Sequence, residues 1–312
     1  MAMFHIGTLI KEQRTGRGAT LDQLCKGICH RTTLMRIEVG ERTPNNFVLA
    51  KLLERLGFHA ERFYFSGQSE IELRFFNLYY EIEGCIMVGE LADVATKVFK
   101  LEQLHQEMNR SETESKIRQQ MIMVMKCALA QKEKEEASKR IEDAKNALGL
   151  TLGSFNEVDV SKLMISYDEI SLLNMLAAAY GENGETDREI NLLYRTKESM
   201  DKYHIDEYEK SRGYILTLFN LSTVLGFAGR HEESLEITNI AIKYCVIHRR
   251  LNLLPALKFN KACSLHFLGS DENYRRLAIE AVYSLRNNEQ YTSAAKRKEF
   301  AEREMGIVFP FW

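Results

Sequence analysis

Residues Ile6 to Leu56 carry the pattern that most constrains the fold, because four short apolar-periodic segments follow one another with sharp breaks between them. Apolar residues recur three and four positions apart in each segment, which is the spacing of a helix with one buried face. Gly16-Arg17-Gly18, Gly40 and Pro44 stand at the breaks, where helices end or have not yet begun. The segment therefore predicts a compact module of four short helices.

Each predicted helix has a recognisable inward face. Thr20 is expected to cap the second helix, since a hydroxyl can accept a hydrogen bond from a free N–H of the first turn. The third helix begins near Arg31 and ends at Gly40, and the fourth covers Asn46 to Leu56. The expected core residues are Ile6, Leu9, Ile10, Leu21, Leu24, Cys25, Leu34, Ile37, Leu49, Leu52, Leu53 and Leu56.

The second and third helices, joined by a short turn around Ile28, predict a helix-turn-helix. In such a motif the second helix of the pair enters the DNA major groove and presents its N-terminal side chains to base edges. Arg31 can reach a guanine, and Thr32 or Thr33 a thymine methyl or a phosphate. The outward candidates are His30, Arg31, Thr32, Thr33, Met35 and Arg36; the alternative is that any one of them is merely exposed.

Charge is distributed unevenly along the chain. Residues 1–66, called the head below, hold 10 Lys and Arg against 6 Asp and Glu, a net charge of +4. The rest, residues 67–312, called the body, carries −6, so that the whole chain has a net charge of −2. A basic head suits contact with phosphate, which again points to double-stranded DNA as a partner.

The head resembles the lambda-repressor-like (Xre-type) module. The likeness lies in Ile6-Gly7, Lys11 and Arg14, and again in Arg36-Ile37-Glu38-Val39-Gly40 with Pro44. In that family an arginine of the first helix and a glutamate of the third form a structural ion pair. The resemblance therefore implies that Arg14 pairs with Glu38, and that Glu38 is an anchor rather than a catalytic carboxylate.

Two positions depart from this family. It often has glutamine early in the second helix, where this chain has Leu21, and glycine in the turn, where this chain has Ile28. The variant Gly27-Ile28-Cys29 before the recognition helix resembles the peptide-responsive PlcR/Rgg-like (RRNPP-type) regulators. The aromatic-rich segment Gly57 to Ser69 is interpreted as a connector that packs against its neighbours; the alternative is a simple extension of the fourth helix.

The body predicts consecutive helical hairpins. Turns are expected at Asn183-Gly184-Glu185, Ala228-Gly229-Arg230 and Leu268-Gly269-Ser270, with further turns near Gly89 and Gln131. The glycines of the first three turns are 45 and 40 residues apart, longer than the roughly 34 residues of a tetratricopeptide repeat. About five such pairs predict an irregular all-α solenoid of tetratricopeptide type.

A Phe-Asn or Leu-Asn pair recurs on the first helix of several hairpins, at residues 76–77, 173–174, 219–220 and 259–260. A buried amide needs hydrogen-bond partners, which an extended peptide backbone can supply. Phe219 and Phe259 are expected to form pockets for the side chains of such a peptide. The PlcR-like resemblance implies that Asn174, Asn220 and Asn260 clamp the peptide. Candidates for the groove ends are Arg212, Lys258 and His266. The alternative is that these asparagines bond neighbouring helix backbones.

Composition excludes several other classes. No apolar run approaches the length of a membrane span, and residues 1–5 lack the start of a secretory signal. The six cysteines fall in apolar helical patterns, as expected of a reducing cytoplasm, and Cys25, Cys29 and His30 lack a fourth metal ligand. No phosphate-loop, nucleophile-elbow or zinc-protease motif is present, so neither an enzyme nor a cofactor is predicted.

These observations favour a cytoplasmic, homodimeric, DNA-binding transcriptional regulator controlled by a short signalling peptide. A dimer is expected because one recognition helix contacts too few bases for specificity. The sequence leaves two alternatives open. In the first, the body serves only as a dimerisation and docking scaffold of a ligand-independent repressor. In the second, protein binding is the main role of the body, and DNA binding is secondary.

Overall fold

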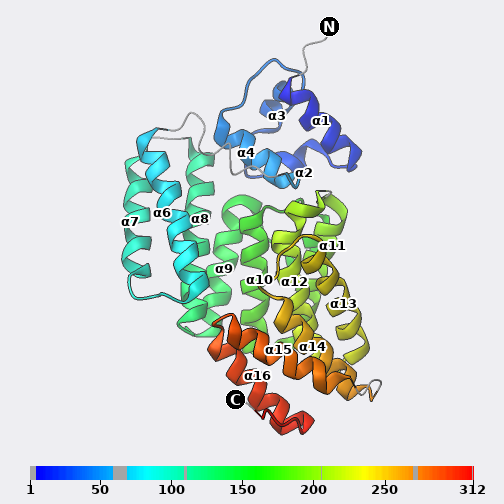
Figure 1. Ribbon diagram of the computed structural model, residues 1–312. Coiled ribbons are helices and arrows are strands. Elements are labelled where there is room, and N and C mark those ends of the chain that lie inside the picture. Colours follow the sequence, from blue (N-terminus) through cyan, green and yellow to red (C-terminus); the bar gives the residue numbers. More distant parts are fainter. Residues whose placement is uncertain (1–4, 59–68, 109–110, 205, 270–272, 311) are drawn as a thin grey trace. The chain divides into compact units, whose positions relative to one another are not determined.

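The computed structural model describes residues 5–58, 69–108, 111–204, 206–269, 273–310 and 312. Over these residues the chain is all-α and contains no strand, which confirms the predicted fold class (Figure 1). The chain divides into two compact units, Met1–Lys210 and Ser211–Trp312, called the first and second unit below. The predicted head–body boundary at residue 66 and most of the connector lie outside the described residues.

Four helices form the head at the start of the first unit: α1 (Ile6–Gly16), α2 (Leu21–Cys25), α3 (Arg31–Glu38) and α4 (Asn46–Arg55). Thr20 caps α2 as predicted. Its hydroxyl accepts from the Gln23 N–H, and the Gln23 side chain accepts from the Thr20 N–H in return. The Asn45 side chain caps α4 by accepting from the Val48 N–H at 2.8 Å. Polar caps thus start both helices at the places where their apolar periodicity begins.

The predicted core of the head is present. Nine of the expected residues are buried, and the remaining three, at the outer edge of this core, are half-buried. Ile28 is also buried, at 4% exposure, and Gly27 takes the positive φ of +69° that turns the chain between α2 and α3. The turn glycine therefore stands one position earlier than in the Xre-type pattern, and Ile28 fills the core instead. The buried set is Ile10, Leu24, Cys25, Leu34, Ile37, Leu49, Leu52, Leu53 and Leu56; the half-buried set is Ile6, Leu9 and Leu21.

Three helix pairs complete the first unit. They are α6 (Glu70–Val88) with α7 (Val94–Glu107), α8 (Glu112–Lys132) with α9 (Ala137–Leu152), and α10 (Tyr167–Glu182) with α11 (Thr186–Tyr203). Figure 1 shows α6 to α10 running side by side. A 3-10 helix, η1 (Glu157–Lys162), is inserted between α9 and α10 and packs on α11. Gly89 ends α6 with φ +85°, a conformation that glycine adopts without steric cost.

The hairpins continue with α12 (Glu207–Phe227), which crosses the boundary between the units, and α13 (His231–Ile247). The second unit also contains α14 (Leu254–Phe267), α15 (Tyr274–Asn287) and α16 (Tyr291–Met305). The described helices α6 to α15 thus make the five predicted pairs. Four of their turns fall at the predicted glycines, and the turn between α8 and α9 lies at residues 133–136, just after the predicted Gln131. Gly184 and Gly229 both have positive φ, +83° and +74°.

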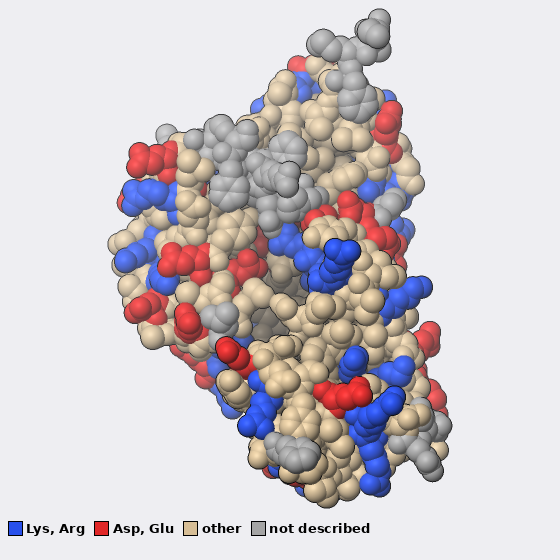
Figure 2. All heavy atoms as spheres, in the orientation of Figure 1, with Lys and Arg blue, Asp and Glu red and all other residues tan. Residues whose placement is uncertain are grey.

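None of the helices in the described part of the chain is long and apolar enough to cross a membrane. On the face drawn in Figure 2, Lys and Arg side chains of the body are interspersed with Asp and Glu, as expected from its small net charge. On that face, therefore, charge does not mark a nucleic-acid surface on the body.

Candidate nucleic-acid interface and peptide-binding residues

Helix α3 is held with one face buried and the other outward. Leu34 and Ile37 on the inner face are at most 1% exposed. His30 is its N-cap residue, and its Nδ1 accepts from the Thr32 N–H at 3.3 Å while lying 2.8 Å from the Thr32 hydroxyl. The first turn of α3 is therefore ordered by side chains at the end that a recognition helix presents to DNA.

Five of the six predicted DNA-binding candidates lie on the outer face of α3 or at its N-cap. His30, Arg31, Thr32, Met35 and Arg36 are exposed, and Thr33 is half-buried. Arg31 lies 3.6 Å from Asp22, and the two side chains are 62% and 68% exposed. Such a surface pair contributes little stability, so Arg31 can exchange Asp22 for a base edge at small cost.

The predicted ion pair between Arg14 and Glu38 is formed in the structure and ties α1 to α3. Arg14 Nε donates to Glu38 Oε1 at 2.6 Å, and Nη2 donates to Oε2 at 2.8 Å. Arg14 Nη1 also donates to the Ala19 carbonyl at 2.8 Å. The hydrogen bond with Glu38 raises the pKa of Arg14 despite the opposing effect of burial. A bidentate pair with side chains 11% and 5% exposed fixes the angle of α3.

Close approach of α1 to α3 depends on Gly7, whose role the sequence pattern alone did not reveal. A Cβ at Gly7 would lie 1.8 Å from the Ile37 carbonyl oxygen, well inside contact distance. Only a residue without a side chain fits there. Gly7 is therefore a positioning residue for the recognition helix.

Helix α4 is fastened to the first turn of α10 by two buried ion pairs. Lys51 Nζ lies 2.9 Å from Asp168 Oδ2, and Arg55 Nη2 lies 2.7 Å from Glu169 Oε1. All four side chains are at most 6% exposed. A buried charge that loses its partner is strongly destabilising. Helix α4 can therefore separate from α10 only if water reaches the charged groups of both pairs.

The two carboxylates of this joint are further satisfied from the body. Asp168 Oδ1 accepts from the Tyr79 hydroxyl at 2.9 Å. Glu169 accepts from the Thr151 hydroxyl at 2.6 Å and from the Ser166 N–H at 2.7 Å. Burial, with help from Asp168, raises the pKa of Tyr79 well above its usual value. The two carboxylates are thus held by contacts of the body as well as by the cations of α4.

Arg17 adds a second attachment point. Its Nε donates to the Tyr203 carbonyl at 2.9 Å, and Nη2 donates to the Leu56 carbonyl at 2.8 Å. The last carbonyl groups of a helix lack partners within that helix. One guanidinium therefore satisfies the C-terminal end of α4 in the head and of α11 in the body, and burial lowers its pKa.

Two backbone contacts bring head and body still closer. A Cβ at Gly27 would lie 2.1 Å from the Thr151 carbonyl oxygen, and one at Gly57, where φ is +78°, would lie 3.2 Å from the His204 Cα. His204 is buried, its Nε2 lies 2.9 Å from the Ile165 carbonyl oxygen, and burial lowers its pKa to about 4. At these two glycines the head therefore lies so close to the rest of the first unit that a side chain would have to displace its neighbours.

The leucines of the fourth helix predict its buried face, but they do not indicate that Lys51 and Arg55 form this joint. Two cations spaced four residues apart inside a leucine-rich helix share one face, which was the available signal. Their partners are 117 and 114 residues away in the sequence, so no local pattern could have supplied them.

Asn174 and Asn260, two of the predicted peptide-clamp residues, are engaged within the fold. Asn174 in the first unit is 3% exposed, and its Nδ2 donates to the Ile170 carbonyl at 2.9 Å in its own helix. Asn260 in the second unit donates to the hydroxyls of Ser222 and Thr223 at 3.0 and 2.8 Å, which ties α14 to α12. Both amides thus form hydrogen bonds within the fold, although neither bonds the backbone of a neighbouring helix as the alternative expected.

The predicted pocket phenylalanines differ from each other. Phe259 is 4% exposed and lies in the core of the second unit, with its ring 6.2 Å from that of Phe300. Phe219 and Asn220 are half-buried on α12. The three candidates for the groove ends, Arg212, Lys258 and His266, are also half-buried.

No family model and no curated protein sequence matches this chain significantly. Solved structures do match it over nearly its whole length. Bacillus thuringiensis PlcR in complex with the peptide PapR7 and DNA is 21% identical, with a TM-score of 0.59 over 93% of this chain and 98% of that one. PlcR in its apo form is 18% identical, with a TM-score of 0.57 over 93% and 97%.

The competence regulator ComR from Streptococcus vestibularis, in complex with its cognate signaling peptide XIP, is 13% identical. Its TM-score is 0.53 over 97% of this chain and 99% of that one. At these identities the likeness concerns the fold, and it extends from the first head helices to the last helix of the body. The chain thus has the all-α fold of the PlcR and ComR regulators.

Proposed function

We propose that this chain is a sequence-specific DNA-binding transcriptional regulator whose helical-repeat body senses a short signalling peptide. The observation that carries the DNA-binding part is the outer face of α3, where five of six candidate side chains are exposed above a buried Leu34–Ile37 face. The Arg14–Glu38 pair holds that face in position. The arrangement fits a helix that is inserted into a major groove.

The peptide-sensing part is supported by fold similarity. The PlcR structure holds the peptide PapR7 together with DNA, and the ComR structure holds the peptide XIP. Both have the fold seen here. For this chain we propose a peptide ligand in the groove of the repeat helices, with the half-buried Phe219 and Asn220 of α12 as candidate contacts.

DNA selection from a random library tests the first part. Full-length protein is expected to enrich a near-palindromic site, because a dimer reads two half-sites. Arg31→Ala should relax preference at one position of each half-site and weaken binding by ~1–3 kcal/mol. Arg276→Ala, which removes an exposed arginine of the second unit, is the matched control and should leave the selected site unchanged. The same enriched sequence from both variants would refute the role of Arg31.

Native mass spectrometry of protein purified from its own host tests the second part. A dimer that carries an extra mass, which fragments as a short peptide, is the expected result. A dimer without added mass, even after incubation with spent culture medium, would contradict peptide sensing and leave DNA binding intact.

A ligand-independent repressor is the second candidate, and a specific observation favours it. The amide donors of Asn174 and Asn260 are already engaged within the fold. Because these amides already donate hydrogen bonds within the fold, they do not require a ligand as a hydrogen-bond partner. Asn220→Ala separates the two candidates, because it should weaken peptide binding in a sensor and leave DNA affinity unchanged in both.

A further inference from the structure

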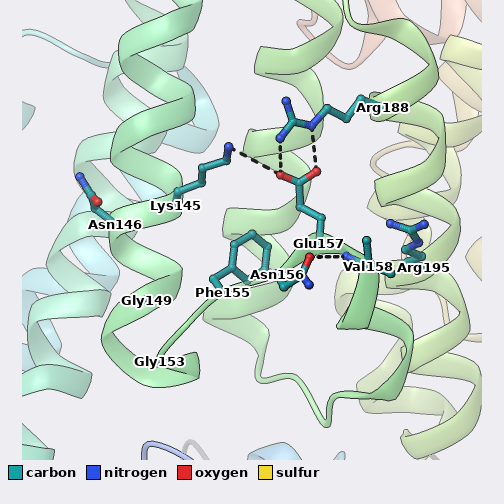
Figure 3. Close-up of a pocket in the computed structure, with 10 residues that line it drawn as sticks. All are labelled: Lys145, Asn146, Gly149, Gly153, Phe155, Asn156, Glu157, Val158, Arg188 and Arg195. Atoms are coloured by element: carbon teal, nitrogen blue, oxygen red, sulfur yellow. Dashed lines mark hydrogen bonds and ion pairs between the residues drawn. The ribbon is translucent and has the colours of Figure 1, made fainter.

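A polar pocket opens in the first unit between α9, η1 and α11 (Figure 3). Its volume of about 610 Å³ is in the range of sites for small molecules. Its walls come from one end of α9, from the turn that follows, and from one face of α11. The lining residues are Lys145, Asn146, Gly149, Gly153, Phe155, Asn156, Glu157, Val158, Arg188 and Arg195. None of them belongs to the head or to the proposed peptide groove.

Glu157 gives the pocket a rigid centre. Arg188 donates to both its oxygens, Nε to Oε2 at 2.9 Å and Nη2 to Oε1 at 2.8 Å, and the Tyr180 hydroxyl donates to Oε1. Lys145 Nζ lies 3.7 Å from the same oxygen. Burial raises the pKa of Glu157, but the hydrogen bonds from Arg188 and Tyr180 outweigh it, so that the pKa is lowered. The carboxylate is thus ionised and neutralised by Arg188.

Arg195 is left with an unused charge. Among the residues that the structure describes, its guanidinium has no hydrogen-bond or ion-pair partner, although the side chain is half-buried. It stands seven residues after Arg188 on α11, two helical turns along the same face. Figure 3 shows it on the far side of Glu157 from Lys145. With three cations and one carboxylate, the lining has a formal charge of +2.

Gly149 is an independent sign that the space is kept open. It lies inside α9, where glycine is less favourable than alanine. Nothing in the structure lies within 4 Å of the position that its Cβ would occupy. No close neighbour therefore requires glycine at this position, and the lack of a side chain leaves room in the pocket.

We propose that the α9–η1–α11 pocket binds a small organic anion through a phosphate or carboxylate group, with the Arg195 guanidinium as its main partner. A guanidinium presents a planar fork of N–H donors that matches two oxygens of either group. Phe155 offers an apolar wall beside these charged groups. Such a ligand would be a second input to the protein, separate from DNA and peptide.

Calorimetric titration of the full-length protein with inorganic phosphate, and separately with citrate, tests the proposal at constant ionic strength. Saturable binding of one anion per chain is expected for at least one of the two. If phosphate alone binds, the ligand is a phosphate compound, whereas binding of citrate alone indicates a carboxylate. No saturable heat with either anion would overturn the proposal.

Three variants locate the site. Arg195→Ala should weaken binding at least tenfold, and Gly149→Leu should abolish it by filling the pocket, while circular dichroism shows both variants folded. Arg276→Ala removes an equally charged but 76% exposed side chain in the second unit and should bind as the wild type does. Affinity unchanged by Arg195→Ala, or equally reduced by Arg276→Ala, would show that the anion does not use this pocket. Because the readout involves neither DNA nor peptide, its failure is distinguishable from failure of the proposed regulator function.

Discussion

Replacement of Glu169 by glutamine tests whether buried ion pairs hold the head to the body. Glu169 and its partner Arg55 are 0% and 2% exposed at 2.7 Å, so solvent screens neither charge. Glu169→Gln keeps the shape and removes the charge, which leaves the Arg55 guanidinium buried without a counter-charge. The expected loss is about 3–5 kcal/mol in the free energy of unfolding of the first unit.

The reverse variant should cost somewhat less. Arg55→Met leaves Glu169 charged, but the carboxylate still accepts from the Thr151 hydroxyl and the Ser166 N–H. We expect a loss near the lower end, about 3 kcal/mol. The double variant removes both charges and should recover to within about 1 kcal/mol of the wild type, since a buried pair can often be replaced by neutral residues.

Urea denaturation supplies the unfolding free energies, and hydrogen exchange of peptides from α4 and α10 shows whether the loss is local to the joint. Glu280→Gln is the control, because its partner Arg276 is 3.7 Å away and the two side chains are 76% and 53% exposed. It should change stability by less than about 0.5 kcal/mol. Single-variant losses below about 1 kcal/mol, or strictly additive losses in the double variant, would refute the reasoning.

Three further outcomes are expected. His204 has a pKa of about 4 in the folded protein and is therefore neutral there, so up to about 3 kcal/mol of stability should be lost as the pH falls from 6.5 towards 4. His204→Gln should flatten that part of a curve of stability against pH. Parallel curves for the variant and the wild type would contradict this prediction. Gly7→Ala should lower the free energy of unfolding by about 2 kcal/mol, because its methyl group overpacks against α3. Gly149→Ala should raise it by about 0.5–1 kcal/mol, because alanine favours a helix interior. Thermal melts measure both changes, and two changes of the same sign would contradict this prediction. Asp22→Asn should tighten DNA binding severalfold in low-salt anisotropy titrations, because it frees Arg31 and removes a charge that repels phosphate; weaker binding would exclude Asp22 as a competitor.

The features that the sequence predicted well are local or belong to a known motif. Helix periods and turn glycines depend on residues three to five positions apart, so Gly184 and Gly229 fall at the predicted turns. Arg14 and Glu38 are 24 residues apart, but both positions belong to the recognised Xre-type pattern, so their pairing could be predicted. In each case the information needed lies within one short stretch or one recognised pattern.

Polar residues on apolar helices were harder to interpret. The Asn in a Phe-Asn pair has the same sequence appearance whether it faces a groove or braces a neighbouring helix. Asn260 bonds two hydroxyls on α12, some 37 residues away, and Asn174 bonds its own helix. Only the packing of the helices decides between these outcomes, and packing is set by contacts distant in the sequence.

The joint between α4 and α10 also constrains how the proposed regulator can respond to a ligand. Two buried ion pairs and the Arg17 guanidinium hold the head to helices α6 to α11, so that we expect these elements to move as one rigid body. Release of the head would have to hydrate these charges together, which a ligand can drive only if it binds the released state far more tightly. Movement of one whole first unit against its counterpart in a dimer breaks none of these contacts. A ligand that prefers one such arrangement can therefore alter the spacing of two recognition helices at much smaller cost, and that is the route we expect regulation to take.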